Sequence, residues 1–400
     1  MATLIPFRAL RPTPADAERI ASVPYDVVST EEARALAHGN PLSFLRVSRA
    51  ELELADDTDP YSAAVYERAA DNFRMLKDAS LVVEDEPSVY FYRLRMGTHT
   101  QTGMAACFSI DEYDRDVIKK HERTRRDKED DRTRHLIALG AQTGPVFLTY
   151  RASADVNDIA SRRTAQAPLF DFEAPDGVRH TIWVVGGRDR DALVAAFARV
   201  PTLYIADGHH RAASAARART ELHGRGESGA MLAVAFPHDQ VQILAYNRAV
   251  KDLGGLSPDA FLGAVRERFD VAPGPASPSR RGEIAMYIGG AWYTLKPTPS
   301  PSASDPIGSL DVSVLQEHLL APVLTVLDVR TDKRIEFIGG ARGTSALAQL
   351  VDSGKAAVAF SLFPVSVADL MAVSDAGAIM PPKSTWFEPK LRDGLLSHLI

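Results

Sequence analysis

The stretch Leu203-Tyr-Ile-Ala-Asp-Gly-His-His-Arg211 decides how this chain of 400 residues is interpreted. Its first four residues are apolar and predict a short buried strand. Gly208 permits a tight turn, and the Ala-rich segment 212–222 that follows predicts a helix. This order of strand, glycine and helix places unpaired backbone N–H groups and a partial positive charge beside the polar residues Asp207–Arg211.

These polar residues have the chemistry of a phosphate site. Gly208 lets a ligand approach the backbone, and Arg211 can hold phosphate oxygens with two donors. His209 and His210 add donors or a proton carrier. Asp207 can bind Mg²⁺ or accept a hydroxyl proton. The alternative is that Asp207 only caps the helix while the histidines are surface residues, but five consecutive polar or glycine residues at this junction favour the phosphate site.

Composition limits the class of protein. The chain is 45% hydrophobic and 24% charged, as is usual for a soluble globular protein. Its 46 basic and 52 acidic residues give a net charge of −6, which argues against a binder of duplex nucleic acid. The single cysteine, Cys107, excludes an intrachain disulfide framework. Without an apolar run long enough for a membrane span or a secretory signal, we expect a cytoplasmic protein.

Helices and strands alternate irregularly along the sequence. Helices are expected from the capping box Ser29–Glu32 to Gly39, and at 60–77, 191–198, 212–222, 312–320 and 345–351. Strands are expected at 88–96, 104–110, 145–150, 180–185, 203–206, 231–236, 242–250, 334–338 and 356–360, with a hairpin around Gly289-Gly290. The pattern predicts an α/β fold, with mixed α+β as the alternative. Residues 272–281 and 298–306 are expected loops, and we expect a core at 1–270 and a C-terminal α/β portion at 271–400.

The segment 119–135 is dense in charge. By itself, such a run predicts a solvated helix whose opposite charges pair at i,i+4 spacing. Pro24-Tyr25-Asp26 similarly predicts no more than a rigid turn ahead of the first helix. Near the other end, the prolines of segment 381–390 exclude a helix interior, so its lysines and hydroxyls lie in an extended loop that suits a phosphate or carboxylate. Exposed lysines on a segment pinned by its aromatic residues are an equal alternative.

The phosphate-site motif resembles one in known proteins. Residues 204–211, followed by two alanines, resemble the strand–Gly-x-x-Arg–helix unit with which the ParB/sulfiredoxin-like superfamily binds nucleotide phosphates. The nearest variant is the Asp-Gly-His-x-Arg form of the free-serine kinases. The whole chain resembles the domain of unknown function family 1015, through residues 23–27, 40–41, 121–124, 205–211, 247–250, 381–385 and 387–390. The resemblance implies a ParB/sulfiredoxin-like nucleotide-binding core with elaborations.

The same resemblance points to further site residues. In the charged segment it implies Glu122 as general base or Mg²⁺ ligand, His121 as proton shuttle and Thr124 in phosphate binding. A magnesium ion would then be held by Asp207 and Glu122. The substrate-binding residues that it implies are Asp26, Arg248, Lys383, Ser384 and Thr385. For Arg248, a structural ion pair is the alternative.

These observations predict a nucleotide-dependent phosphotransferase acting on a small hydroxylated metabolite. The resemblance implies free serine or phosphoserine as the substrate, ATP or ADP as the nucleotide, and Mg²⁺ as the metal. One alternative is a nucleotide-binding switch or regulatory module of the ParB type. Another is a phosphoserine-type phosphatase that uses the same residues. The expected partners are small molecules, without nucleic acid or membrane, and a homodimer is left open.

Overall fold

The chain forms two compact units. The computed structural model describes residues 1–302 and 305–400. The first unit comprises Met1–Lys120, Thr124–Val241 and Pro389–Ile400, and the second comprises His121–Arg123 and Gln242–Glu388. The domain boundary expected near residue 270 therefore falls inside the second unit. Among the described residues, no helix is both long and apolar enough to cross a membrane.

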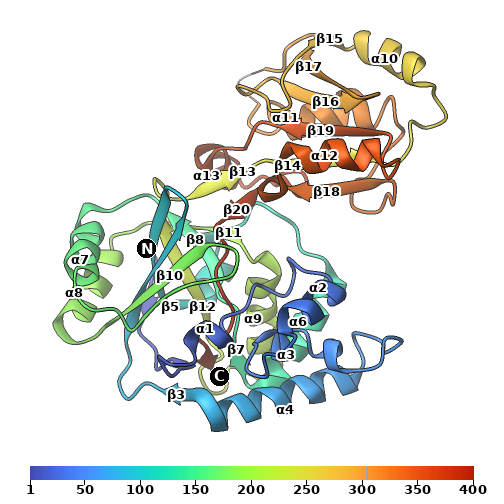
Figure 1. Cartoon of the computed structure of the whole chain (residues 1–400). Helices are drawn as coiled ribbons and strands as arrows, with labels where there is room; N and C mark the ends of the chain where they lie inside the picture. The colour runs from blue at the N-terminus through green and yellow to red at the C-terminus, as the bar shows by residue number, and fades with distance from the viewer. Residues whose placement is uncertain (303–304) are drawn as a thin grey trace. The chain divides into compact units, whose positions relative to one another are not determined.

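The first unit is built from a large mixed sheet and helices packed on it (Figure 1). Its strands are β1 (Leu4–Ile5), β2 (Leu10–Pro12), β3 (Leu81–Val83), β4 (Val89–Met96), β5 (His99–Ser109), β6 (Ile118–Lys119), β7 (Ala141–Gln142), β8 (Val146–Tyr150), β9 (Phe170–Glu173), β10 (Val178–Val185), β11 (Leu203–Asp207), β12 (Ala230–Pro237) and β21 (His398–Leu399). The order in the nine-stranded sheet is β6-β11-β8-β12-β5-β4-β10-β9, with β1 paired to β5. The β6–β11 and β8–β12 pairs are parallel and the others are antiparallel, so the sheet is mixed.

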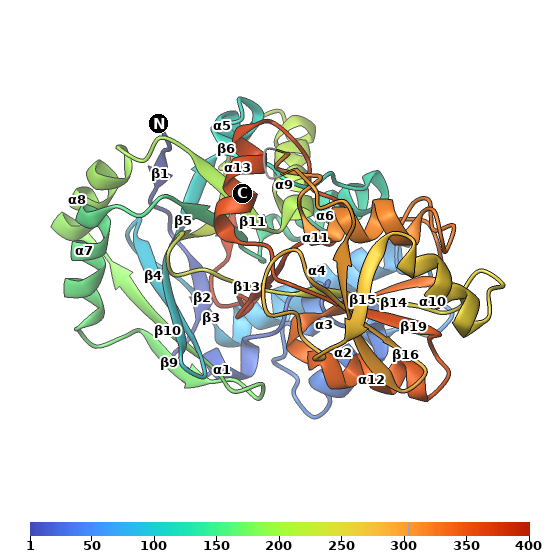
Figure 2. The ribbon, with the colours of Figure 1, turned by 90° about the horizontal axis from the view of Figure 1, so that it is seen from above.

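Helices cover this sheet and a second, smaller core. They are α1 (Ala17–Ile20), α2 (Thr30–Ala37), α3 (Leu45–Ser48), η1 (Ala50–Glu53), α4 (Ala63–Ser80), α5 (Ile110–Asp114), α6 (Arg126–Leu139), α7 (Ala154–Thr164), α8 (Gly187–Phe197) and α9 (His209–Glu221). The main core packs alternate residues of the strands, which share one face, against α7, α8 and α9. Figure 2 shows α7 and α8 side by side. Three of the four buried alanines of α9 belong to this core and let the helix approach the sheet closely.

The second unit has an antiparallel sheet of its own. Its elements are β13 (Gln242–Leu244), β14 (Tyr246–Val250), α10 (Pro258–Arg266), β15 (Phe269–Pro273), β16 (Ile284–Ile288), β17 (Ala291–Pro297), α11 (Asp311–Leu315), η2 (Gln316–Leu320), β18 (Ile335–Gly339), η3 (Gly340–Arg342), α12 (Gly343–Asp352), β19 (Val358–Leu362), α13 (Val367–Asp375) and β20 (Trp386–Glu388). The order is β15-β17-β16-β19-β14-β18, and α12 packs on this sheet through Leu347 (Figure 1). Strands β13 and β20 form a separate pair.

The mixed α/β class is confirmed, and so are most of the expected elements. Ser29 and Glu32 form the predicted capping box at the start of α2. The expected strand 242–250 is wrong in one respect, because it divides into β13 and β14, which belong to different sheets. The expected loop at 272–281 begins inside β15, and two residues of the loop at 298–306, 303 and 304, lie outside the described residues.

Candidate functional site

The predicted strand–glycine–helix junction is present in the first unit. Strand β11 ends at Asp207, and α9 begins at His209. Gly208 joins them with φ 92° and ψ 32°, a conformation that residues with a side chain rarely adopt. A Cβ atom at this position would also lie 3.0 Å from Nε of Arg211. The glycine is therefore required both by the backbone and by the guanidinium that packs over it.

Asp207 is fixed in place at the end of β11. Its Oδ1 accepts a hydrogen bond from the Gly208 N–H at 2.9 Å, and its Oδ2 accepts one from Nζ of Lys390 at 3.0 Å. Lys390 comes from segment 389–400, which belongs to the first unit, whereas the preceding segment 242–388 belongs to the second. The sequence placed this lysine only in an extended loop. The structure pairs it with the carboxylate of the phosphate-site motif.

Arg211 lies inside the first unit instead of extending into solvent. Nη1 donates a hydrogen bond to the carbonyl oxygen of Pro145, and Nη2 lies 3.8 Å from Oδ2 of Asp207. Nε is buried and has no hydrogen-bond partner in the part of the chain that the structure describes. Burial lowers the pKa of Arg211, but the carboxylates of Asp26, Asp207 and Asp393 outweigh it and raise that pKa above its ordinary value. Arg211 is thus a fixed cation whose Nε–H donor is unused.

The two histidines of the motif are not exposed surface residues. His209 is buried and His210 is half-buried. Nε2 of His210 accepts a hydrogen bond from the backbone N–H of Arg125 at 3.0 Å, which brings the residues just before α6 to the motif. Thr124, a predicted phosphate-binding residue, donates its hydroxyl to the Glu129 carboxylate. Arg125 therefore lies beside the start of α9.

A cavity of about 50 Å³ lies beside Arg211. A buried water needs roughly 10–15 Å³, so the cavity has room for a few waters or a small ion but not for a nucleotide. Its lining comes from several segments of the first unit: Tyr25, Ser48, Arg132, His135, Leu136, Ala141, Gln142, Thr143, Gly144, Val146, Arg211, Ser214, Leu232 and Asp393.

Asp393 is the most perturbed carboxyl group of this cavity. Burial raises its pKa to about 7, with Asp26 adding to the rise and Arg211 opposing it. Its Oδ1 is buried and makes no hydrogen bond to any described residue. A Cβ atom at Gly144 would lie 2.8 Å from this oxygen, so a glycine is needed opposite it. Asp393 can therefore gain or lose a proton near neutral pH.

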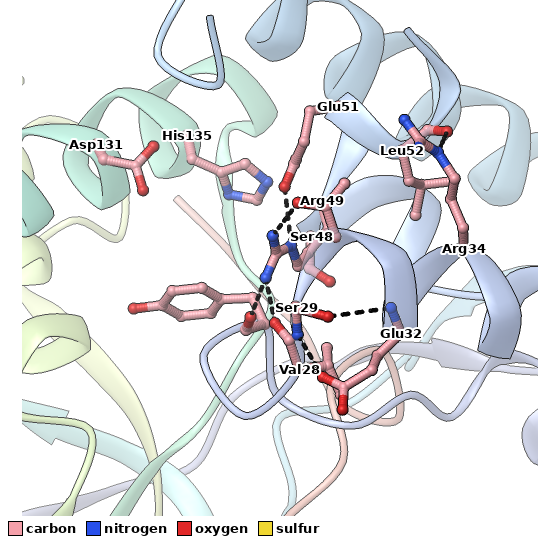
Figure 3. A network of polar contacts seen from close by, with 12 residues as sticks. Val28, Ser29, Glu32, Arg34, Ser48, Arg49, Glu51, Leu52, Asp131 and His135 are labelled. Carbon is pink, nitrogen blue, oxygen red and sulfur yellow. Dashed lines mark hydrogen bonds and ion pairs between the residues drawn. The ribbon is translucent and has the colours of Figure 1, made fainter. Parts of the chain in front are cut away.

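Tyr25 contributes to the lining of the cavity, and the turn that carries it is held by Arg49, which Figure 3 shows beside Val28 and Glu51. This arginine donates to the carbonyl oxygens of Tyr25 and Val28 and pairs with Glu51 at 2.8 Å. The ring of Tyr25 in turn lies 4.2 Å from the guanidinium of Arg132. Asp26 is exposed, and its charge acts on Arg211 and Asp393. The predicted rigid turn is confirmed, and Asp26 lies close to the motif.

The other predicted substrate residues lie in the second unit. Arg248 is buried in β14, and Nη2 donates to the carbonyl oxygens of Pro382 and Lys383 at 3.2 and 2.9 Å. Burial lowers the pKa of Arg248 to about 9. The alternative of a structural ion pair is wrong, because no carboxylate pairs with Arg248 among the described residues. This arginine holds the backbone of the 381–385 segment, so its side chain is committed to structure.

The remaining residues of that segment are also engaged. The Ser384 hydroxyl donates to the carbonyl oxygen of Pro381 at 2.6 Å, and Nζ of Lys383 lies 5.7 Å from the centre of the Tyr246 ring. Thr385 Oγ1 lies 3.4 Å from Nε2 of His121. His121 is buried and Glu122 is half-buried. The roles of His121, Glu122 and Thr385 stay predictions, as does a metal ion held by Glu122 together with Asp207.

Sequence reasoning missed the cavity residues Asp393, Gln142 and Gly144, and the positioning role of Arg49. One signal was available for Asp393. The pair Arg392-Asp393 interrupts an otherwise apolar run between Leu391 and Leu396, and buried charged groups usually mark a site or an ion pair. No such signal marks Gly144, whose importance depends on a partner far along the chain.

Comparisons with known proteins find one matching family model and several solved structures of low similarity. A family model described as "Protein of unknown function (DUF1015)" matches residues 4–313. No curated protein sequence matches the chain significantly. Among solved structures, the chain is similar to a free serine kinase in complex with AMP, with 14% identity, a TM-score of 0.37, and coverage of 73% of this chain and 92% of that one.

Two other solved structures are similar at the same level. One is SbnI with a C-terminal truncation from Staphylococcus aureus, with 14% identity, a TM-score of 0.39 and coverage of 72% and 85%. The other is a conserved hypothetical protein from Pyrococcus furiosus, with 14% identity, a TM-score of 0.37 and coverage of 74% and 95%. Likenesses this distant do not establish a shared function.

Proposed function

The chain belongs to the family of proteins of unknown function DUF1015, and we propose that it is a nucleotide-dependent phosphotransferase acting on a small hydroxylated metabolite. The nucleotide phosphates would bind at Asp207–Arg211. The observation that carries the proposal is the junction at Gly208. A left-handed glycine there connects a buried strand to a 13-residue helix, with a fixed arginine packed over it.

The junction has the elements that bind phosphate in proteins. The first turn of an α-helix presents N–H groups without partners inside the helix, and the helix dipole favours an anion there. Arg211 adds a permanent positive charge, and Lys390 contacts the same oxygen of Asp207, Oδ2. Asp207, Asp26 and Asp393 balance these cations in the structure described. When a phosphate binds, its oxygens would replace these carboxylates as the partners of Arg211.

The carboxylates also suit a magnesium ion. Hard oxygen ligands are what Mg²⁺ requires, and Asp207 offers a carboxylate at the end of β11. When bound, Mg²⁺ would neutralise negative charge that develops on the transferred phosphoryl group. Both oxygens of Asp207 are engaged, by Gly208 and Lys390, and these contacts fix the orientation of the carboxylate.

Proton transfer from the substrate hydroxyl needs a base that is active near neutral pH. Asp393 meets that requirement, because its pKa of about 7 matches the pH range in which a general base works best. Glu122, with His121 as its shuttle, is the base proposed from the sequence. Replacing each carboxylate by its amide and comparing the pH dependence of turnover would distinguish the two assignments.

Serine is the first substrate to test, because the Asp-Gly-His-x-Arg motif resembles that of free-serine kinases. We place Asp26 beside the bound substrate, since it is exposed and its charge acts on Arg211. A carboxylate in this position could receive the amino group of an amino acid. Assays should follow phosphate transfer from ATP or ADP to serine, and also phosphate release from phosphoserine without nucleotide, which would identify a phosphatase instead.

Calorimetric titration with ATP, ADP and CTP in the presence of Mg²⁺ tests the proposal. We expect Arg211→Ala to weaken nucleotide binding roughly 10- to 100-fold, since a hydrogen bond to a charged group contributes about 1.5–3 kcal/mol. Arg219→Ala is the matched control, because Arg219 lies on the same helix but pairs with Asp111 and Asp114. Circular dichroism should confirm that both variants are folded. Equal nucleotide affinity of wild type and Arg211→Ala would refute the site.

A further inference from the structure

A second cavity, of about 310 Å³, lies in the first unit and shares no lining residue with the one at Arg211. The register of β4 and β5 builds its floor. Arg93 lies opposite Thr102, and Phe91 lies opposite Met104. Residues two apart on a strand share a face, so all four side chains point the same way. The floor is therefore half polar and half apolar.

Helix α7 forms the opposite wall. Its lining residues follow helical spacing and so share one face of the helix: Val156, Asn157, Ala160, Ser161 and Thr164. Tyr150 and Gln240 complete the lining. Ser161 is exposed and Asn157 is half-buried, so the cavity opens to solvent along this helix.

Arg93 is the single charged group of this lining. Nε donates to the Thr102 hydroxyl at 3.0 Å, Nη2 donates to the Thr164 hydroxyl at 2.9 Å, and the guanidinium lies 4.9 Å from the centre of the Trp183 ring. No carboxylate pairs with Arg93 within residues 1–302 and 305–400. Partial burial lowers the pKa of Arg93, which reflects the cost of keeping an uncompensated cation here.

Two further polar groups of the lining have unused hydrogen-bonding capacity. The Tyr150 side chain lines the cavity and is 1% exposed, and burial raises the pKa of its hydroxyl, which therefore stays protonated and can donate a hydrogen bond. The Gln240 side chain uses its oxygen to accept from the Thr102 N–H at 2.9 Å, which leaves its NH₂ group as a donor. A carboxylate bound in the cavity could accept hydrogen bonds from both groups.

We propose that this cavity binds a small organic acid, with its carboxylate at Arg93 and Tyr150 and its apolar part against Phe91 and Met104. An anion fits because the lining holds one cation and no acidic residue. An apolar body fits because Phe91 and Met104 continue the floor beyond Arg93. The volume is at the lower end of the range of about 300–1,000 Å³ for ligand pockets, which favours a small molecule. The site is independent of the proposed phosphotransfer.

The test is calorimetric titration of the full chain with four probes: hexanoate, acetate, hexanamide and inorganic phosphate. Hexanoate has both the carboxylate and the apolar chain. Acetate lacks the chain, hexanamide lacks the carboxylate, and inorganic phosphate lacks both. We expect hexanoate to bind at least about tenfold more tightly than hexanamide, a difference typical of one hydrogen bond to a charged group. Acetate should bind more weakly than hexanoate, because it leaves the apolar floor uncovered.

Matched variants locate the binding. Arg93→Gln should remove the preference for hexanoate over hexanamide. Arg95→Gln should keep it, since Arg95 lies two residues along the same strand but outside the lining. Ala160→Phe fills the cavity from α7 without touching Arg93, so it tests the site even if Arg93→Gln does not fold. The proposal is overturned if hexanoate shows no saturable binding, if hexanamide or phosphate binds as well, or if Ala160→Phe leaves hexanoate binding unchanged.

Discussion

Replacing Gly208 by alanine perturbs the phosphate-site motif at its centre. The backbone at this position has φ 92°, and a new Cβ atom would lie 3.0, 3.1 and 3.3 Å from Nε, Cζ and Nη2 of Arg211. Nine in ten real Cβ contacts are longer than 3.0–3.4 Å, so the guanidinium must move by a few tenths of an ångström. It cannot move freely, because Nη1 donates to the carbonyl oxygen of Pro145.

The expected loss of stability has two parts. Left-handed backbone costs a residue with a side chain roughly 1–2 kcal/mol. Weakening the hydrogen bond of Arg211 to a backbone carbonyl adds about 1 kcal/mol, for a total of about 2–3 kcal/mol. Because each kcal/mol lowers the melting temperature of a domain of this size by about 2–4 °C, we expect a fall of about 4–12 °C. Nucleotide affinity should fall about tenfold or more, since the displaced guanidinium no longer faces the helix start.

Gly140→Ala is the matched control. Gly140 ends α6 with φ 61°, and no atom lies within 4 Å of an added Cβ atom. This variant should lose roughly 1–2 kcal/mol of stability through its left-handed backbone, without disturbing Arg211. Thermal unfolding and calorimetric titration with ATP and ADP should therefore show two destabilised variants, of which only Gly208→Ala binds nucleotide more weakly. If both variants kept wild-type affinity, the motif would not be the nucleotide site.

Three further variants test the surroundings of the motif. Burial raises the pKa of Asp393 from 3.8 to about 7, so its stabilising effect is complete below pH 3.8 and is lost as the pH rises through 7. Relative to wild type, the free energy of unfolding of Asp393→Asn should therefore rise by about 4 kcal/mol between pH 4 and pH 8. Parallel profiles of unfolding free energy against pH would contradict this. Lys390→Met should destabilise the first unit by about 1–3 kcal/mol by removing the ammonium group that donates to Asp207, and Lys390→Arg should restore most of that in thermal unfolding. Arg49→Met should speed amide hydrogen exchange in residues 25–32, and unchanged exchange would show that the turn holds without it.

Local chemistry explains which parts of the fold could be predicted. The capping box Ser29–Glu32 and the strand–glycine–helix junction around Gly208 depend on residues within a few positions of one another, so the sequence is sufficient. Helix α7 was not predicted, because only Val156 and Ile159 of its residues are buried and its apolar periodicity is weak. The split between β13 and β14 was missed for a different reason. A Cβ atom at Gly340 would lie 2.6 Å from the Ala245 carbonyl oxygen, and such a close approach leaves no local trace.

The same distinction applies to the candidate site: residues close together in the sequence could be predicted, and contacts between distant residues could not. Asp207 and Arg211 were found because they adjoin each other, whereas the contact of Lys390 with Asp207 spans 183 positions. Arg248 was predicted to bind substrate, and the structure adds that it donates to the carbonyl oxygens of Pro382 and Lys383. An arginine that supports a backbone turn and one that binds a ligand look alike in a single sequence, since both occur in apolar surroundings.

Because residues 389–400 belong to the first unit, the residues of the candidate site are synthesised at widely separated times. Asp207 and Arg211 emerge long before Lys390 and Asp393, because the whole of segment 242–388 is synthesised between them. At about 5–20 residues per second, the 183 positions from Asp207 to Lys390 take roughly 10–40 s. During that time the nascent chain carries the motif without its lysine and without the carboxyl group of the cavity. The site is thus completed only after all residues of the second unit have been made, so a messenger truncated before residue 389 would yield chains that have the motif but cannot assemble its charges.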